Sequence, residues 1–390
     1  MNRQAPPRGF ARAEFEQRLA RAHALMAQAG LDALLLTTEP DIRYFSGFLT
    51  RFWQSPTRPW FLLIPRDRKP IAVIPGIGEP LMASTWIDDV RSWSSPRPDD
   101  EGLSELSDAL REIGADQGRV GVPMGPESTL RMPLSDYQRL TGSLSDASFI
   151  DCSPIIRELR LIKSEAEIAK ITRACSIACD AFDAVPDFAH AGQPLSEVFR
   201  RFKIELMHQG ADDVDYLVGA ASPGGYSDVI SPPSDSPLMD GDVLMMDTGA
   251  VYDGYFCDFD RNFAVGSVGD EVLRANEVLH RATDAGLAAM VPGKTCADVF
   301  NAMGAVIEQQ GYELGNVGRF GHGLGMQLTE WPSMAPADRT LIREGMVLTL
   351  EPGLTIAPGH TLVHEENVVV RAGGAEYLTR RAPEDLPVLR

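Results

Sequence analysis

The chain has 390 residues, and its formal net charge of −19 at pH 7 disfavours nucleic acid and anionic membrane surfaces as partners. Hydrophobic residues make up 44% of the chain and charged residues 23%, which is typical of a globular protein with a sizeable core. The five cysteines are too few and too irregularly spaced for a disulfide scaffold, and no C-x-x-C motif is present.

No segment of the sequence is apolar enough to cross a bilayer, and the first residues carry no signal-peptide pattern. We therefore expect a cytoplasmic location, a small-molecule partner, and no membrane or nucleic-acid partner.

The first part of the chain, residues 1–155, alternates helix and strand signals. Residues 13–30 predict a helix that ends at Gly30, because glycine commonly closes helices. The alternation predicts an α/β domain with a mixed sheet. Its other predicted elements are strands at 31–38, 61–67 and 70–76, a helix at 102–118 and a strand at 119–124.

Residues 156–390 form the second predicted domain, in which pairs of helices alternate with strands. Ser164 and Glu167 match a capping box, which predicts a helix running to about Asp180. This mixture predicts the α+β class. The other predicted elements are helices at 194–210, 270–290 and 296–311, a β-hairpin at 242–265, and strands at 346–354 and 362–370.

The hairpin is the segment whose geometry the sequence predicts most closely. Asp253-Gly254 is a two-residue hairpin signal between two apolar runs. A tight turn there places Asp258 opposite Gly249. Since side chains alternate along a strand, Asp247 and Asp258 then share a face as diagonal neighbours about 7–8 Å apart at Cα.

Asp260 falls on the same face of the predicted hairpin, opposite Asp247. The missing side chain at Gly249 leaves room between the acids, and three acids on one apolar face repel each other strongly without a cation. Two alternatives stay open: a bulge at Gly254 that breaks this register, or an acidic strand face exposed to solvent.

Three further polar residues stand in short apolar or glycine-rich settings. His322 lies between two glycines, which permit close approach of the backbone to a ligand, while Glu351 and Glu366 adjoin strand-like runs. Taken alone, a residue of this kind more often has a structural role than a metal-binding one. Together with the two aspartates they give the oxygen and nitrogen ligands that a pair of Mn²⁺, Fe²⁺, Co²⁺ or Zn²⁺ ions needs. The predicted ligand set is Asp247, Asp258, His322, Glu351 and Glu366.

These segments resemble the consecutive motifs of the M24 family, which contains creatinase, aminopeptidase P, prolidase and methionine aminopeptidase. The matching motifs are GDVLMMDTGAVYDGYFCDFDRNF, GHGLGMQ, LEPG and EENVVV, with weaker matches upstream in DIRYFSGF and RLIKSEAEIAKI. The resemblance implies an α/β creatinase-like N-terminal domain followed by an α+β pita-bread catalytic domain. It also implies a homodimer and a dinuclear metal centre held by the five residues.

The resemblance further implies individual roles. Asp258 and Glu366 bridge the two ions, and Glu351 shuttles a proton. Glu366 is preferred to Glu365 as the last ligand because of the Asn367-Val368 that follows. Asp260 replaces the family's usual hydroxyl, so it is either an added ligand or catalytic base, or a neutral supporting aspartate.

Departures from the family pattern lie in the substrate-facing positions. Ile230, which precedes Asp247 by 17 residues, and Thr329, which follows His322 by seven, stand where the proline-directed peptidases have histidines. Gly318 stands in place of another histidine, and His364 in place of an arginine. Since such side chains bind the peptide carbonyl and stabilise the oxyanion, ordinary Xaa-Pro cleavage is in doubt.

Other candidate substrate contacts come from two loops. Residues 222–234 lie just before the hairpin, and residues 51–61 are rich in Arg and Trp. For each loop a purely structural role is the alternative. The full set of candidate substrate-binding residues is Tyr226, Asp228, Thr329, His364, Trp53 and Trp60.

Three functions follow from these observations. The first is a dinuclear-metal-dependent hydrolase of a small amide or dipeptide. The second is a non-peptidase relative, such as a dimethylsulfoniopropionate-type lyase or a small-osmolyte hydrolase, which the altered substrate positions favour. The third is a non-catalytic binding protein, which the complete ligand set disfavours.

Overall fold

A computed structural model describes residues 5–55, 58–315 and 318–390. The chain divides into two compact units: Pro7–Arg160, and Leu161–Arg390 together with the described residues 5–6. The predicted division at 155/156 falls inside helix α6 (Ser153–Leu161), so the break lies about five residues later. The capping box of the next helix then begins the second unit. Among the described residues, no helix has the length and apolar character needed to span a membrane.

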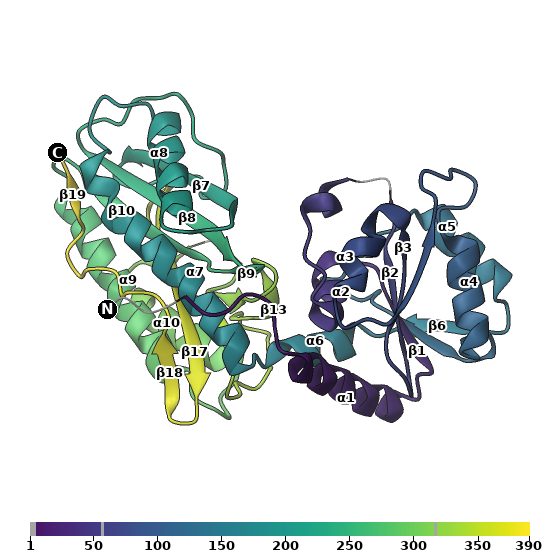
Figure 1. Ribbon diagram of the computed structural model, residues 1–390. Helices are drawn as coiled ribbons and strands as arrows, with labels where there is room; N and C mark the ends of the chain where they lie inside the picture. The colour runs from purple at the N-terminus through teal and green to yellow at the C-terminus, as the bar shows by residue number, and fades with distance from the viewer. Residues whose placement is uncertain (1–4, 56–57, 316–317) are drawn as a thin grey trace. The chain divides into compact units, whose positions relative to one another are not determined.

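The N-terminal unit is built on one mixed sheet, with strand order β4-β3-β2-β1-β5-β6. β1 pairs antiparallel with β2 and parallel with β5, which confirms the predicted α/β class. Apolar residues of α4 and α5 pack on one face of this sheet (Figure 1). The strands are β1 (Ala33–Leu36), β2 (Phe61–Pro65), β3 (Ile71–Pro75), β4 (Asp89–Trp93), β5 (Arg119–Val122) and β6 (Ser148–Asp151). The other helices are α1 (Arg12–Ala29), α2 (Glu39–Ser46), α3 (Glu79–Ala83), α4 (Leu103–Glu112) and α5 (Leu134–Ser143).

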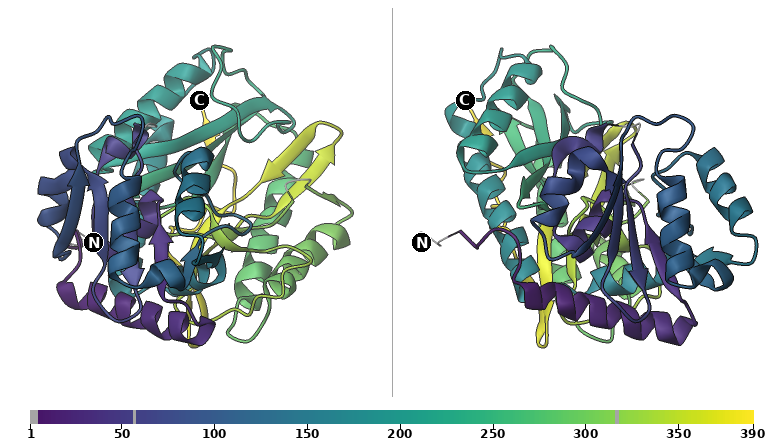
Figure 2. Two further views of the ribbon diagram at one scale, coloured as in Figure 1. Left: turned by 90° about the vertical axis from the view of Figure 1, so that its right-hand side faces the viewer. Right: turned by 45° about the vertical axis from the view of Figure 1, so that its right-hand side comes forward.

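In the described part of the C-terminal unit, four α-helices follow Leu161. α7 begins after Ser164, whose side chain accepts a hydrogen bond from the Glu167 backbone, as the capping box predicts. α9 and α10 pack their apolar faces into the same core as the strands that follow them. The β17–β18 hairpin lies beside α9 (Figure 1), and Figure 2 shows the ribbon from two further sides. The helices are α7 (Glu165–Asp183), α8 (Leu195–His208), α9 (Asp270–Ala289) and α10 (Cys296–Gln309).

Three sheets complete the C-terminal unit, and the α+β class is confirmed. The first has the order β19-β10-β8-β7 with β9 paired to β8, the second β13-β12-β14-β17-β18, and the third β11-β15-β16. The first contains β7 (Asp213–Pro223), β8 (Asp242–Tyr252), β9 (Tyr255–Phe256), β10 (Phe259–Val265) and β19 (Val388–Leu389). The second contains β12 (His322–Gly323), β13 (Glu330–Ser333), β14 (Val347–Leu350), β17 (Glu366–Arg371) and β18 (Gly374–Tyr377). The third contains β11 (Glu313–Leu314), β15 (Gly353–Ala357) and β16 (His360–Val363).

Candidate metal centre

The hairpin between β8 and β10 has the predicted register. Asp253 and Gly254 have φ values of 48° and 76°, which are the left-handed conformations that a two-residue type I′ turn requires. Beyond the turn, Asp260 pairs directly with Asp247. No bulge interrupts the register at Gly254, so Asp247 and Asp258 lie on the same face, as predicted.

The space left by the missing side chain of Gly249 is occupied differently from the prediction. A Cβ atom there would lie 2.3 Å from Cδ1 of Leu328 and 3.0 Å from Cβ of Tyr216. The gap therefore admits the Leu328 side chain, rather than leaving free room between the two aspartates.

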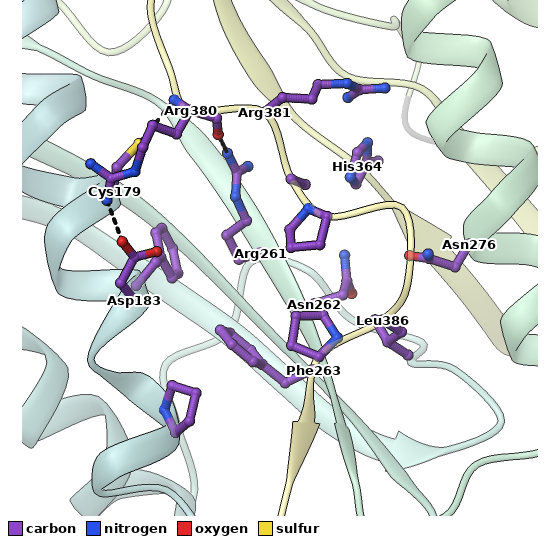
Figure 3. Close-up of a pocket in the computed structure, with 15 residues that line it drawn as sticks. Cys179, Asp183, Arg261, Asn262, Phe263, Asn276, His364, Arg380, Arg381 and Leu386 are labelled. Atoms are coloured by element: carbon purple, nitrogen blue, oxygen red, sulfur yellow. Dashed lines mark hydrogen bonds and ion pairs between the residues drawn. The ribbon is translucent and has the colours of Figure 1, made fainter.

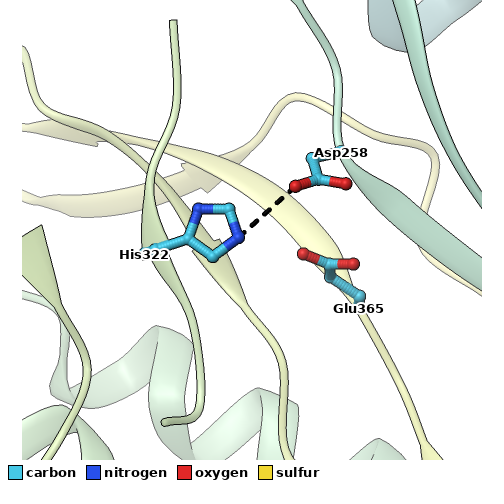
Figure 4. Close-up of side chains that lie close together, drawn as sticks. All are labelled: Asp258, His322 and Glu365. Atoms are coloured by element: carbon cyan, nitrogen blue, oxygen red, sulfur yellow. Dashed lines mark ion pairs between the residues drawn. The ribbon is translucent and has the colours of Figure 1, made fainter. Parts of the chain in front are cut away.

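The centre of the site is a buried group of three side chains from three separate segments. Asp258, His322 and Glu365 each offer a ligand atom, and these atoms lie within 4.8 Å of one another. Nε2 of His322 is 3.3 Å from Oδ2 of Asp258. Figure 4 shows the imidazole pointing toward both carboxylates. One imidazole and two carboxylates within this distance can hold a divalent ion.

The backbone around His322 fixes the orientation of its ring. Nδ1 lies 2.9 Å from the carbonyl oxygen of Gly323, so the Nδ1–H donates there and Nε2 keeps its lone pair for a metal. The flanking glycines are required, because a Cβ atom at Gly321 would lie 2.2 Å from the Thr349 carbonyl oxygen. A Cβ atom at Gly323 would lie 2.4 Å from the Trp331 carbonyl oxygen.

The structure places Glu365, and not the predicted Glu366, beside Asp258 and His322. The Glu366 carboxylate accepts hydrogen bonds from Nη2 of Arg261 at 3.0 Å, from the backbone N–H of Ala382 at 2.8 Å, and from the Thr379 hydroxyl. Consecutive residues at a strand point to opposite sides, so only one of the two glutamates can face the cluster.

Asp247 and Glu351 belong to the same electrostatic group. Burial, followed by repulsion from Asp258 and Glu351, raises the pKa of Asp247 well above its usual value. Burial also raises the pKa of Glu351 to about 7, and Asp258 adds to this effect. Burial lowers the pKa of His322, which favours the neutral imidazole that a metal needs.

Two carboxylate oxygens of the group are buried without a hydrogen-bond partner among the described residues: Oδ1 of Asp247 and Oε1 of Glu365. A buried acceptor without a donor is costly unless a cation neutralises it. The donor set therefore fits one or more divalent ions.

Asp260 supports the cluster instead of joining it. Its carboxylate accepts hydrogen bonds from Nδ2 of Asn262 at 3.0 Å and from the backbone N–H of Glu365. Burial, followed by repulsion from Asp247, raises the pKa of Asp260 well above its usual value. Since both oxygens are engaged, the prediction of an added ligand or base gives way to its alternative, a supporting aspartate.

Several predicted substrate contacts have structural roles instead. Tyr226 is completely buried, and its hydroxyl donates to Oδ1 of Asn262 at 3.0 Å and accepts from the backbone N–H of Val363 at 2.8 Å. His364 is buried, with Nδ1 3.2 Å from the Thr283 hydroxyl.

Asp228 and the two tryptophans also contact residues close to them in the sequence. Asp228 accepts hydrogen bonds from the backbone N–H groups of Ile230 and Ser231, at 2.9 and 3.0 Å, and so closes its own loop. Trp53 and Trp60 are buried in the N-terminal unit with ring centroids 5.4 Å apart. Thr329 is the one predicted substrate contact that is exposed, and it accepts a hydrogen bond from Arg319.

A separate cavity of about 380 Å³ lies in the C-terminal unit, lined by both polar and apolar side chains. Figure 3 shows Arg261, Asn262 and His364 at its wall, beside Phe263 and Leu386. None of Asp258, His322 and Glu365 lines this cavity, so His364 faces a different space from the metal cluster.

The sequence interpretation missed two residues beside the cluster. Tyr216 pairs with Gly249 across β7 and β8, and its side chain lowers the pKa of Asp247 against the larger effect of burial. Arg319 precedes His322 by three residues and lowers the pKa of Asp258 against the larger effect of burial. Neither residue carries a local motif. Pairing of β7 with the hairpin is the only signal that points to Tyr216.

Comparison with known proteins finds similar sequences and structures. The sequence model of metallopeptidase family M24 matches residues 169–372, and that of the creatinase/prolidase N-terminal domain matches residues 18–162. The chain is 28% identical over 361 residues to a Xaa-Pro dipeptidase of Pyrococcus horikoshii, covering 92% of this chain and 95% of the relative. A Xaa-Pro dipeptidase of Lactobacillus delbrueckii subsp. lactis is 25% identical over 363 residues, again covering 92% and 95%. The crystal structure of dipeptidase PepE from Mycobacterium ulcerans is similar, with a TM-score of 0.84 and 26% identity, covering 98% of this chain and 99% of that one.

Proposed function

This chain belongs to metallopeptidase family M24 and is a metal-dependent hydrolase, and we propose that it cleaves a small dipeptide-like amide with a pair of divalent ions. The buried group of Asp258, His322 and Glu365 carries this proposal. The two carboxylate oxygens that have no partner among the described residues support it, because a cation is the simplest group that would satisfy them. The names of the Xaa-Pro dipeptidases that resemble the chain support the substrate class.

Asp258, His322 and Glu365 would hold the ions together with Asp247 and Glu351. When bound, such ions polarise a substrate carbonyl and make a water molecule acidic enough to act near neutral pH. The protein residues hold the site in place. Asp260 fixes the backbone of Glu365, and Oδ1 of Asn367 accepts from the backbone N–H of Asp258 at 2.9 Å.

We assign proton transfer to Glu351. The resemblance to the M24 family supports this role, and in the metal-free protein burial raises the pKa of Glu351 to about 7. Its partial exposure leaves it open toward a substrate, whereas Glu365 and Asp258 are buried.

A second candidate function, chemistry on a non-peptide substrate, is favoured by the substrate-facing positions. Ile230 is 73% exposed and Thr329 is also exposed, and both stand where the family resemblance places imidazoles. An isoleucine cannot donate a hydrogen bond to a developing oxyanion, so the usual peptide contacts are incomplete.

The test has two measurements on the same protein. Metal content after gentle purification would be compared with hydrolysis of a panel of dipeptides, including Xaa-Pro, and a panel of small osmolytes. Bound metal with dipeptide cleavage supports the first candidate, and bound metal with turnover of osmolytes alone supports the second. A metal content below about one ion per chain, with neither activity, indicates a binding protein.

A further inference from the structure

The cavity of about 380 Å³ described above contains no residue of the metal cluster and has walls of two kinds. In the view of Figure 3, Arg380 and Arg381 lie above it, and Phe263 and Leu386 lie below it. Within the described part of the chain, its charged lining residues are three arginines and one aspartate: Arg261, Arg380, Arg381 and Asp183. A cavity of this size is typical of sites for small molecules, and a ligand there would meet both cations and apolar side chains.

The acids that pair with two of these arginines stand outside the cavity wall. Arg261 pairs with Glu366 at 3.0 Å, and Arg381 pairs with Asp284 at 3.0 Å. Neither Glu366 nor Asp284 lines the cavity, whereas both arginines do. Because Coulomb energy falls with distance, a ligand in the cavity is attracted by the nearer positive charges more than it is repelled by the acids behind them. The cavity therefore favours an anion.

Arg261 has one N–H group that remains available to such an anion. Its side chain is 9% exposed. Nη1 donates to the carbonyl oxygens of Asp260 and Glu365, and Nη2 donates to the Glu366 carboxylate and to the carbonyl oxygen of Arg380. Among the described residues, none accepts a hydrogen bond from its Nε–H. A carboxylate oxygen in the cavity would satisfy this nearly buried donor with a charge-assisted hydrogen bond.

His364 supplies a second polar atom, and this one is an acceptor. The Thr283 hydroxyl donates to the Leu279 carbonyl oxygen at 3.0 Å, so its oxygen accepts from Nδ1–H of His364 at 3.2 Å. Burial in a wall that also contains arginines favours the neutral imidazole. Nε2 of that ring carries a lone pair, and it has no hydrogen-bond partner among the residues that the structure describes. A hydroxyl group on the ligand would donate to it.

We propose that this cavity binds a small organic acid with an apolar body, whose carboxylate accepts from Arg261 and whose neighbouring hydroxyl donates to His364. The apolar body would pack against Phe182, Phe263 and Leu386, which line the same space. An entrance from solvent lies beside Arg380 and Asp183, because both side chains are exposed. This binding site does not rest on the proposed hydrolase function.

The cavity is connected to the metal centre through the backbone that leads into β17. His364 directly precedes Glu365, and Nη1 of Arg261 holds the carbonyl oxygen of Glu365 at 3.0 Å. An acid that contacts both Arg261 and His364 therefore acts on the segment that carries Glu365. Its binding should change the affinity of the protein for Mn²⁺, and Mn²⁺ should change the affinity for the acid by the same factor. This coupling, unlike the acid site, rests on the proposed metal centre.

Calorimetric titration of the full chain with three probes tests the site: L-3-phenyllactate, 3-phenylpropionate and 3-phenylpropionamide. We expect 3-phenylpropionate to bind roughly 10-fold more tightly than its neutral amide, as for a hydrogen bond between charged groups. The hydroxyl of phenyllactate should add about 5-fold, as for a neutral hydrogen bond. No binding of either acid, or equal binding of acid and amide, overturns the proposal. Equal binding of the two acids shows that the contact to His364 is wrong.

Ala382→Leu tests whether the acid binds in this cavity. Ala382 lines the cavity, and it donates to Glu366 through its backbone N–H, so the substitution adds volume and keeps that contact. We expect affinity for phenyllactate to fall by more than about 10-fold, because the added atoms occupy the space of the ligand. The control Ala288→Leu adds the same atoms at an exposed position of α9 and should bind as wild type does. Equal affinity of both variants places the acid elsewhere and contradicts the proposal.

Arg380→Met gives an independent test should Ala382→Leu fail to fold, which thermal unfolding would reveal. Arg380 is an exposed residue at the entrance, and we expect its loss to reduce the ratio of acid to amide affinity by about threefold, as for an exposed charge. The control Arg274→Met removes an exposed arginine that pairs with Glu271 and does not line the cavity. The same ratio in both variants shows that the charges of the cavity do not select the acid.

Titration with Mn²⁺, with and without saturating phenyllactate, measures the coupling. We expect the affinity for Mn²⁺ to differ by about 5-fold or more between the two conditions. Identical affinities show that the coupling is wrong while the acid site stands. Absence of Mn²⁺ binding in both conditions contradicts the metal centre and with it the coupling, and the probe titrations then decide the acid site alone.

Discussion

Glu365 and Glu366 are consecutive residues where β17 begins, and their carboxylates point to opposite sides of the strand. The Glu365 carboxylate lies within 4.8 Å of ligand atoms of Asp258 and His322. The Glu366 carboxylate forms a buried ion pair with Arg261 at 3.0 Å. We therefore assign different roles to two chemically identical side chains: Glu365 would bind metal and Glu366 would stabilise the fold, and substitution can separate these roles.

We expect Glu365→Gln to remove metal binding and to lower activity by more than about 100-fold, because the amide offers a weaker ligand in a site built from charged oxygens. Metal content measured by mass spectrometry and hydrolysis measured on the same sample check this. The metal-free variant should unfold no more easily than metal-free wild type, since one of several mutually repelling carboxylates is gone. Full metal retention would contradict the assignment of Glu365.

Glu366→Gln is the matched variant, and we expect it to act on stability. Arg261 is buried and also donates to the carbonyl oxygens of Glu365 and Arg380, so loss of its partner leaves a charge without compensation. Breaking a buried pair from one side costs about 3–5 kcal/mol of unfolding free energy. Urea denaturation measures this cost, and a variant as stable as wild type but unable to bind metal would restore Glu366 as the ligand.

The metal-free protein should lose stability as pH rises. The pKa of Glu351 is raised from 4.5 to about 7 in the folded state, and burial raises those of Asp247, Asp258 and Glu365 as well. For a group whose folded pKa is raised, the stabilisation is complete below the unfolded pKa and is lost as pH rises through the folded pKa. We therefore expect the free energy of unfolding to fall between about pH 4.5 and 7 because of Glu351.

Added Mn²⁺ should reverse this trend, because the ion binds the deprotonated carboxylates and releases their protons. Thermal unfolding at pH 5.5 and pH 8, with and without Mn²⁺, measures both effects. In Glu351→Gln the decline in the metal-free protein should be smaller. A rise in metal-free stability across this interval, equal in wild type and variant, would show that the acids are not a coupled buried group.

Gly321→Ala tests the close approach of the backbone around His322. The φ of Gly321 is 126°, and the added Cβ atom would lie 2.2 Å from the Thr349 carbonyl oxygen, so the His322 segment must move. We expect loss of metal affinity and a destabilisation on the order of 3 kcal/mol, beyond the backbone strain alone.

Gly359→Ala provides the control for that substitution. Its φ is 80°, but no atom lies within 4 Å of the added Cβ, so only the strain of the left-handed conformation applies. About 1 kcal/mol of destabilisation with normal metal content is expected. Similar behaviour of the two variants would mean that contact with Thr349 is unimportant.

The sequence predicted the parts of the site that depend on local rules. The Asp253-Gly254 turn fixes the register of the hairpin, and alternation along the strands then places Asp247, Asp258 and Asp260 on one face. Glu365 could not be chosen over Glu366 in the same way, because the start of β17 cannot be located to one residue from an apolar run. A shift by one residue exchanges the two faces.

The burial of Tyr226 and His364 could not be predicted from the sequence for a different reason. The direction of Tyr226 is set by hydrogen bonds to Asn262 and Val363, which are distant in sequence, and that of His364 by Thr283 on α9. The local sequence around a residue does not predict hydrogen-bond partners that lie far away in the chain. The same is true of Arg319, whose guanidinium donates to the hydroxyls of Ser333 and Thr329 in a later segment.

Asp260→Asn tests whether a supporting residue controls the metal centre. Asp260 accepts hydrogen bonds from the backbone N–H of Glu365 and from Nδ2 of Asn262, and an asparagine has only one oxygen to offer these two donors. We expect Glu365 to be held less firmly and metal affinity to fall by about 10- to 100-fold, as for other residues that orient metal ligands. Titration of metal-free protein with Mn²⁺, followed by calorimetry, measures the affinity. The exposed Asp235, which accepts a hydrogen bond from Ser196, gives the control Asp235→Asn, whose affinity should equal that of wild type. If Asp260→Asn binds Mn²⁺ as tightly as this control, the contact to the Glu365 backbone does not position the ligand, because an altered contact that mattered would change the occupancy of the site.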